Sequence, residues 1–302
     1  MIRIFTVLLL TITATNGNTQ PNDRKLQKQV DALVKDFNGT IGIYIKDLKK
    51  GRVTTYNADT VFPTASIVKV PILIGIMDKM NRGELTYGQS LTYRDSLLYA
   101  GVDILGSFKQ DEKIELGKLV MLMLTMSDNT ASLWLQSLAG TGTRINAILD
   151  SMGFVHTRVN SRTPGREANR TQYGWGQSTP REMSLLFEKI YKGEVVSKTA
   201  SDKMLRLLNR NFFDREAVSQ LPPYTVVFTK NGAVNQTRNE VVLVKGQQST
   251  YVFCIMTKNN KDESWLDNNE AWELIRKLSR LLWNYYEPKD KWQPPADAKK
   301  FD

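Results

Sequence analysis

The chain has 302 residues, 41% of them hydrophobic, which suits a globular protein with one large domain or two modest ones. Its 41 basic and 31 acidic residues give a net charge of +10, but no block of like charges or basic-aromatic repeat occurs, which disfavours nucleic-acid binding. With one histidine and one cysteine, an intramolecular disulfide is excluded and little room is left for a zinc site. We expect no cofactor and no metal.

The first 20 residues have the pattern of a secretory signal peptide. Arg3 precedes an apolar run over residues 4–14, and polar residues follow up to Gln20. The run is shorter than the roughly 20 residues that span a bilayer. No cysteine lies near the expected cleavage site at 14–20, so nothing indicates a lipid anchor. We predict an exported protein, periplasmic or secreted, that is monomeric and has no stable membrane anchor.

Helical and strand patterns then follow one another in a definite order. A helical spacing of apolar residues covers 23–37, and strands are predicted at Thr40–Asp47 and Val53–Tyr56, with a turn between them. Helical patterns dominate up to about residue 213, and strands return before a final amphipathic helix. The predicted helices cover 66–80, 116–126, 131–138, 144–152, 179–191, 201–209 and 268–285, and the later strands cover 224–229, 240–244 and 251–257.

This order predicts an α+β fold. One antiparallel sheet would be built from N- and C-terminal strands, with helices on both faces and an all-helical subdomain at about 64–215. Residues 21–287 would form this domain, and residues 288–302 a loosely attached tail. The active site would lie at the seam between sheet and helical subdomain.

Three further features have mostly structural interpretations. The polar stretch 160–178 is long for a loop, and loops of such length are usually functional or omega loops. Cys254 lies in an apolar, strand-like run, which favours a buried, inert thiol. His156 has no neighbouring metal ligands, so we interpret it as a structural or surface residue.

Ser66-Ile67-Val68-Lys69 places a hydroxyl and an amine three residues apart at the head of an apolar run. On a helix this spacing puts both side chains on one face. Loss of solvation lowers the pKa of a lysine, so Lys69 can serve as a base that activates Ser66 as a nucleophile. The structural alternative is an N-cap serine followed by a lysine one turn later.

Two later segments supply groups that a Ser–Lys hydrolase needs. Ser127-Asp128-Asn129 is a polar turn between two apolar helices, which lets Ser127 and Asn129 face a shared site. Lys230-Asn231-Gly232 ends a predicted strand, and Gly232 would allow a substrate backbone to approach. Taken singly, the first is also a good helix N-cap sequence and the second a good turn.

In this order and spacing the three segments resemble the motifs of class A β-lactamases and related penicillin-recognising serine enzymes. The resemblance covers roughly residues 24–286. Further similar segments are 39–47, 57–63, 124–131, 149–153 and 178–183. It implies the β-lactamase-like, three-layer α/β/α fold for this chain, as an atypical member of the family.

The resemblance also implies roles for individual residues. Ser66 would form an acyl-enzyme with a β-lactam, with Lys69 as base or proton relay, and Ser127, aided by Lys230, would pass a proton to the leaving nitrogen. The backbone N–H groups of Ser66 and Ala233 would form the oxyanion hole. Asn129 would bind the side-chain amide of the substrate. Lys230, Asn231 and Arg238 would bind the substrate carboxylate, with Gly232 beside them.

Two departures from the family pattern matter. Asn231 stands where the family usually has Ser or Thr, and an amide cannot relay a proton as a hydroxyl can. Thr163 occupies the position of the loop glutamate that activates water for deacylation. The nearest acid is Glu167, which can act as the base only if the loop is rearranged; otherwise it is a solvated charge.

The predicted function is therefore that of an exported, class A β-lactamase-like serine hydrolase. The sequence leaves open whether it hydrolyses its acyl-enzyme. Its partner would be a small β-lactam or a peptidoglycan-like substrate. The alternatives are a D,D-peptidase or esterase, and a protein that binds penicillin or peptidoglycan peptides without turnover.

Overall fold

The computed structural model describes residues 21–101 and 103–296. The predicted signal peptide and the last six residues of the predicted tail lie outside this part of the chain. Within the described tail, Asp290 accepts a hydrogen bond from Tyr224 Oη (2.8 Å) and Trp292 O accepts one from Arg280 (2.8 Å). This stretch of the tail is therefore tied to the domain.

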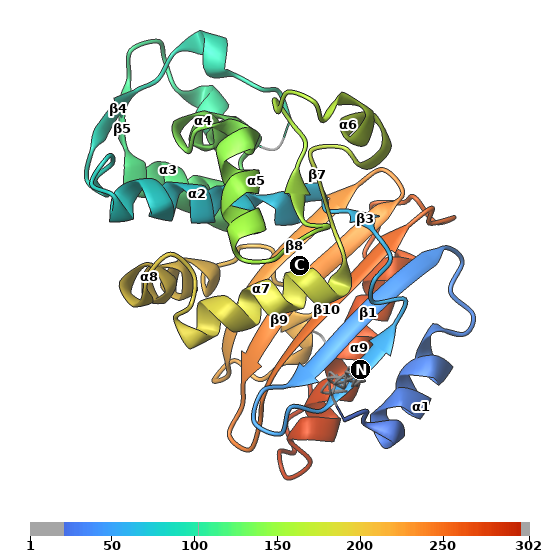
Figure 1. Ribbon diagram of the computed structural model, residues 1–302. Coiled ribbons are helices and arrows are strands. Elements are labelled where there is room, and N and C mark those ends of the chain that lie inside the picture. Colours follow the sequence, from blue (N-terminus) through green and yellow to red (C-terminus); the bar gives the residue numbers. More distant parts are fainter. Residues whose placement is uncertain (1–20, 102, 297–302) are drawn as a thin grey trace, which may run out of the picture.

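A five-stranded antiparallel sheet, in the order β2-β1-β10-β9-β8, forms the centre of the fold (Figure 1). The N-terminal hairpin pairs with the C-terminal strands through β1 and β10, where Thr40 lies opposite Lys258. This confirms the predicted sheet built from both ends of the chain. The strands are β1 (Thr40–Asp47), β2 (Val53–Tyr56), β8 (Val226–Val234), β9 (Thr237–Lys245) and β10 (Thr250–Lys258).

Helices cover both faces of this sheet, which gives the three layers (Figure 1). On one face, α1 (Arg24–Val34) and α9 (Glu270–Tyr286) bury alternate side chains such as Val242 and Phe253. On the other face, α7 (Pro180–Lys192) covers the intervening side chains, among them Cys254. Because both faces are buried, the strands are almost continuously apolar rather than alternating with polar residues.

The helical region is built around α2 (Lys69–Asn81), which is buried along its whole first part. Such an all-round apolar helix belongs inside a protein, and other helices surround it. These are α3 (Leu116–Thr125), α4 (Asn129–Leu138), α5 (Thr141–Ser151) and α8 (Lys198–Leu208). The region also holds a short antiparallel pair, β4 (Ser90–Thr92) and β5 (Lys113–Glu115), which the sequence analysis did not predict.

A small three-stranded sheet joins the two regions beside the predicted nucleophile. Its strands are β3 (Phe62–Pro63), β7 (Gly176–Ser178) and β6 (Arg158–Val159), in that spatial order. The loop predicted at 160–178 starts after β6, contains the short helix α6 (Glu167–Tyr173) and ends with β7. Among the described residues, no helix is long and apolar enough to cross a membrane.

Candidate active site

Ser66 lies in a one-turn 3-10 helix, η1 (Ala65–Val68), that leads directly into α2. Ile67 and Val68 are fully buried and fix this turn in the core, whereas Ser66 stays partly exposed. Ala65 has a φ of 46°, an uncommon conformation for a residue with a side chain. No side-chain hydrogen bond caps η1 or α2, so the N-cap interpretation of Ser66 does not hold.

The amine of Lys69 joins the first two motifs. Lys69 Nζ lies 3.1 Å from Ser66 Oγ, 3.0 Å from Ser127 Oγ and 3.0 Å from Asn129 Oδ1. It also donates to the backbone carbonyl of Ser127. Among the described residues, no carboxylate forms a hydrogen bond or ion pair with Lys69.

The same surroundings lower the pKa of this lysine. Lys69 is fully buried, and burial together with the nearby charge of Lys230 lowers its pKa well below the ordinary value, although Asp128 opposes this. A lowered pKa favours the neutral amine, whose lone pair can accept a proton. Lys69 is thus suited to deprotonate the Ser66 hydroxyl at 3.1 Å.

The turn between α3 and α4 holds Ser127 and Asn129 in place. Ser127 has a φ of 56°, and Asp128 caps α4 by accepting a hydrogen bond from Ala131 N at 2.7 Å. The second carboxylate oxygen of Asp128 accepts hydrogen bonds from two backbone N–H groups, including that of Leu105 at 2.9 Å. The N-cap interpretation therefore holds for Asp128. The turn still presents Ser127 and Asn129 to Lys69.

The third motif lies within β8, the outer strand of the sheet, rather than in a turn after it. Gly232 meets the nucleophile segment: a Cβ added here would lie 2.8 Å from Ser66 N and 2.7 Å from Thr64 O. Only glycine permits this approach. The close contact brings β8 and the backbone of Ser66 together.

The pairing of β8 with β9 shows where the Ala233 N–H points. Ala233 lies opposite Arg238, whose N–H donates to Thr257 Oγ1 (3.0 Å) and whose carbonyl accepts from the same hydroxyl (2.7 Å). Residues opposite each other in an antiparallel pair exchange both hydrogen bonds or neither. Because the backbone groups of Arg238 face β10, those of Ala233 face the free edge of β8, as an oxyanion hole requires.

Lys230 is a second fully buried lysine close to Lys69. Its Nζ donates to Asn231 O (2.9 Å) and Asn231 Oδ1 (3.1 Å). Burial lowers its pKa to about 7, although Glu240 and Glu216 favour the charged form. Lys230 thus changes charge near neutral pH, with Asn231 as its immediate partner.

Arg238 does not join this group. Its side chain is fully buried, lies over the rings of Trp265 (4.4 Å) and Trp272 (4.8 Å), and donates to carbonyls such as Asn235 O (2.7 Å). The next residue, Asn239, lies opposite Gly232 and donates to Pro63 O at 2.8 Å. A shift of one residue along a strand reverses the face of the side chain. Asn239, which the sequence analysis missed, thus holds β9 against the segment before Ser66.

A family model described as the beta-lactamase enzyme family matches residues 25–286. The chain belongs to this family. It is a serine hydrolase of the β-lactamase type, as its relatives and the class A fold of its neighbours indicate.

Individual relatives are distant but nearly full-length. The chain is 23% identical to beta-lactamase VEB-1 of Pseudomonas aeruginosa over 94% of this chain and 97% of that protein. It is 26% identical to a point mutant of PBP-A in an acyl-enzyme complex with penicillin G, with a TM-score of 0.78 over 89% of this chain and 98% of that one. A class A beta-lactamase from Bacteroides cellulosilyticus shares the fold with a TM-score of 0.76, at 21% identity over 88% of this chain and 98% of that one.

The loop of this β-lactamase family member brings no carboxylate to Ser66. Thr163, the residue predicted to replace the family's glutamate, is buried and donates to Ser161 O at 2.8 Å. It packs against α5, because a Cβ on Gly142 would lie 1.8 Å from Thr163 Oγ1. Glu167 is exposed at the start of α6, where it accepts a hydrogen bond from Gly165 N (3.1 Å).

Neutral amides hold the loop closed instead. The guanidinium of Arg166 donates to Asn160 Oδ1 (2.9 Å) and to Gln177 Oε1 (2.8 Å), and Asn169 donates to the same oxygen of Gln177 (3.0 Å). Among the described residues Arg166 has no acidic partner within ion-pair distance. Partial burial, with the charge of Arg158, lowers the pKa of Arg166.

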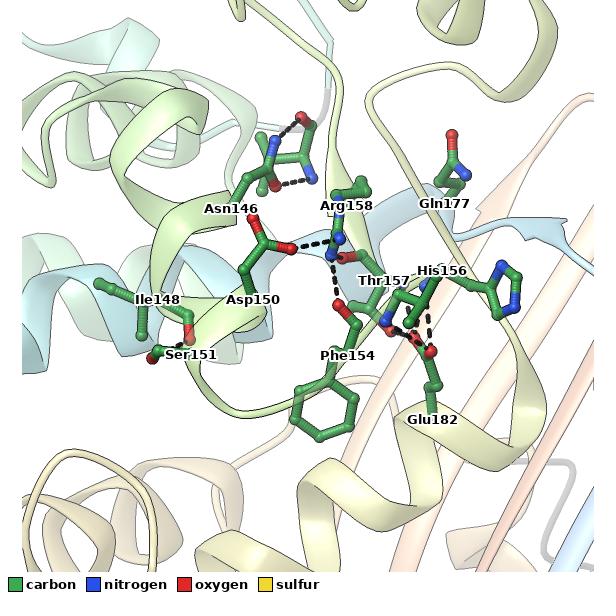
Figure 2. A network of polar contacts seen from close by, with 12 residues as sticks. Asn146, Ile148, Asp150, Ser151, Phe154, His156, Thr157, Arg158, Gln177 and Glu182 are labelled. Carbon is green, nitrogen blue, oxygen red and sulfur yellow. Dashed lines mark hydrogen bonds and ion pairs between the residues drawn. The ribbon is translucent and has the colours of Figure 1, made fainter.

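Glu182 of α7 anchors the chain just before this loop (Figure 2). Its carboxylate accepts hydrogen bonds from the backbone N–H groups of Val155 (2.9 Å), His156 (3.0 Å) and Thr157 (2.6 Å). Thr179 caps the same helix by accepting from Glu182 N at 3.1 Å. The lone histidine thus contributes its backbone here, which agrees with a structural position.

Proposed function

We propose that β-lactams acylate this enzyme at Ser66, and that hydrolysis of the acyl-enzyme is its slow step. The observation that carries the proposal is the buried amine of Lys69, 3.1 Å from Ser66 Oγ and bonded to no carboxylate. It supplies a base for acylation. The loop supplies none for deacylation.

Acylation would begin with proton transfer from Ser66 Oγ to neutral Lys69. The oxygen attacks the β-lactam carbonyl, and the backbone N–H groups of Ser66 and Ala233 stabilise the oxyanion. Ser127 Oγ, 3.0 Å from Lys69 Nζ, then passes a proton to the leaving nitrogen while Lys69 returns its own. The products are an ester on Ser66 and an opened ring.

Substrate recognition would use the same side of the sheet. Charged Lys230 attracts the substrate carboxylate, and the Asn231 amide can donate to it. Asn129 would bind the amide of the acyl side chain from the opposite side of Ser66. We leave Arg238 out of the carboxylate site because its guanidinium is enclosed by Trp265 and Trp272.

Deacylation needs a base that activates water, a contribution of about 10²–10⁴-fold in rate. Thr163 has no carboxylate and faces α5, and the carboxylate of Glu167 is exposed and bonded within its own turn. The acyl-enzyme should therefore persist far longer than in a class A enzyme with the loop glutamate.

The likeness to PBP-A, a point mutant of which is seen as a penicillin G acyl-enzyme, supports acylation by penicillins. It also favours a second candidate function: a penicillin-binding or D,D-peptidase-type enzyme whose natural substrate is a peptidoglycan peptide. The two functions share Ser66, Lys69 and the oxyanion hole. They differ in what releases the acyl group.

One experiment tests the acylation that both functions share, together with the rate of its reversal by hydrolysis. The protein is mixed with a fluorescent penicillin and with a chromogenic cephalosporin, while intact mass and ring opening are followed in time. We expect a rapid, stoichiometric adduct on Ser66 and slow ring opening after the first turnover. Fast steady hydrolysis would refute slow deacylation, and no adduct with any β-lactam would refute the proposed function altogether.

A further inference from the structure

A cavity of about 890 Å³ lies at the end of the sheet away from the Ala233 edge. Its walls are formed by the turn between β1 and β2, the start of α1, the turn between β9 and β10 and the end of α9. In the β8–β9 pair, Lys245 opposite Val226 marks this end, and Arg238 opposite Ala233 marks the other. The cavity is thus separate from the candidate active site.

Four cations line this cavity: Lys25, Lys50, Arg52 and Arg280. None of them forms an ion pair within the described part of the chain, although many other surface cations do. Lys25 Nζ lies 5.8 Å above the ring of Tyr285. Four cations that form no ion pair and lie around one cavity repel one another, and an anion would relieve this.

Arg280 holds a buried donor that is left unpaired. Its Nη2 donates to Trp292 O (2.8 Å), and its guanidinium carbon lies 5.7 Å from the Trp292 ring. Its buried Nη1 has no hydrogen-bond partner, and burial lowers the pKa of this arginine. An unpaired buried donor is costly, so a small shift of this side chain toward a ligand would be favourable.

The two acids that line the cavity have other partners. Asp23 Oδ1 accepts hydrogen bonds from Leu26 N (3.2 Å) and Tyr285 Oη (2.8 Å). Asp47 Oδ1 accepts from the N–H groups of Lys49 (2.9 Å) and Lys50 (3.0 Å). These two carboxylates fix the turns that form the walls. With four cations and two carboxylates, the lining keeps an excess of two positive charges.

We propose that this cavity is a second binding site, for an anion with several phosphate or carboxylate groups. Arg52 and Arg280 would bind the anionic groups through their forked guanidinium donors, and Lys25 and Lys50 would add charge at the rim. Binding would not compete with acylation, because the two sites lie at different ends of the sheet. This inference is independent of the proposed β-lactam chemistry.

The test is calorimetric titration of the purified protein with inorganic tripolyphosphate and, in parallel, with citrate. We expect saturable binding that weakens as salt is raised. The double variant Arg52→Gln/Arg280→Gln should bind about tenfold or more weakly. The matched control, Lys118→Gln/Arg206→Gln, removes the same charge from exposed helix positions and should bind within about twofold of the parent.

Three outcomes would overturn the proposal: no saturable binding of either probe, an equal loss in both double variants, or loss of binding once Ser66 is acylated by penicillin. The first outcome would mean that the cavity binds neither probe, and the second that binding depends on net charge alone. The third would mean that the probes bind near Lys230. Tighter binding of one probe identifies phosphate or carboxylate as the preferred group. If Arg280→Gln disturbs folding, Lys25→Gln/Lys50→Gln tests the exposed rim in the same way.

Discussion

The nucleophile side and the loop side of the candidate active site hold their charged groups in opposite ways. On the nucleophile side, Lys69 and Lys230 are fully buried, and within the described part of the chain no carboxylate forms an ion pair with either. On the loop side, Glu167 is exposed, and Arg166 is tied only to amide oxygens. Buried, unpaired lysines lose charge readily, whereas an exposed carboxylate remains an ordinary solvated anion.

This difference separates two steps that usually depend on each other. Acylation needs a neutral amine beside the serine, and burial lowers the pKa of Lys69 in the direction that favours this form. Deacylation needs a carboxylate aimed at the ester, and the loop presents the hydroxyl of Thr163 toward α5 instead. If the two sides act independently, a substitution on the loop side should leave the rate of acylation unchanged.

Lys69→Met should have the largest effect. Methionine fills a similar volume but cannot accept the Ser66 proton, so acylation should slow by about 10²–10⁴-fold. Folding should be kept, because the change removes a buried amine that has no charged partner. The rate of adduct formation is measured by intact mass, with Lys79→Met, on the surface of the same helix, as the control. Parent-like acylation in Lys69→Met would mean that another group is the base.

The pH dependence of acylation should depend on Lys230. Its pKa of about 7 means that it is charged below, and neutral above, this pH, so recognition of a substrate carboxylate should weaken as pH rises through 7. The acylation rate constant divided by the dissociation constant of the non-covalent complex should then fall above pH 7, approaching about tenfold per pH unit. Lys230→Arg stays charged, so the fall should move to much higher pH.

A β-lactam methyl ester is the matched substrate, because it lacks the carboxylate. It should show no fall near pH 7 with the parent enzyme. If the ester showed the same fall, a group other than Lys230 would cause it, and the predicted role of Lys230 in carboxylate recognition would be wrong.

Local patterns predicted the sheet and most helices well. The bounds of β1 and β2 follow from the two apolar segments and the turn at Gly51, whose φ is 69°. Strand β8 was predicted at 224–229, with Lys230-Asn231-Gly232 at its end and a turn as the structural alternative. Pairing with β9 carries it on to Val234, which is a tertiary effect that local sequence does not contain.

The site was predictable where a motif fixes it and not where register or packing decides. The first two motifs led to Ser66, Lys69 and Asn129, and the structure brings Ser66 and Asn129 within hydrogen-bond distance of Lys69. Counting along the sequence could not tell that Arg238 faces the tryptophans, since one residue of register reverses the face. Helix α6 was missed because none of its residues is buried, so it has no apolar face to detect.

Glu182→Gln should have a moderate effect, on stability alone. The carboxylate accepts from three consecutive backbone N–H groups before the loop, and an amide offers one acceptor oxygen without charge. We expect the free energy of unfolding to fall by about 1–3 kcal/mol, measured by urea denaturation. The exposed carboxylate variant Glu84→Gln is the control and should show no clear change. A tenfold loss of acylation in Glu182→Gln would show that the loop side supports the nucleophile side after all.

Glu167→Gln should have the smallest effect. The Glu167 side chain is exposed, and its one hydrogen bond, from Gly165 N, can be kept by the glutamine oxygen. Acylation and the slow release of the acyl group should both stay within about twofold of the parent, as expected for exposed substitutions. Both are followed by intact mass after a single addition of penicillin, with Glu263→Gln as an exposed control. If release stops in Glu167→Gln alone, the loop must rearrange in the acyl-enzyme to bring this carboxylate to the ester. Slow deacylation would then reflect the cost of that rearrangement rather than a missing base.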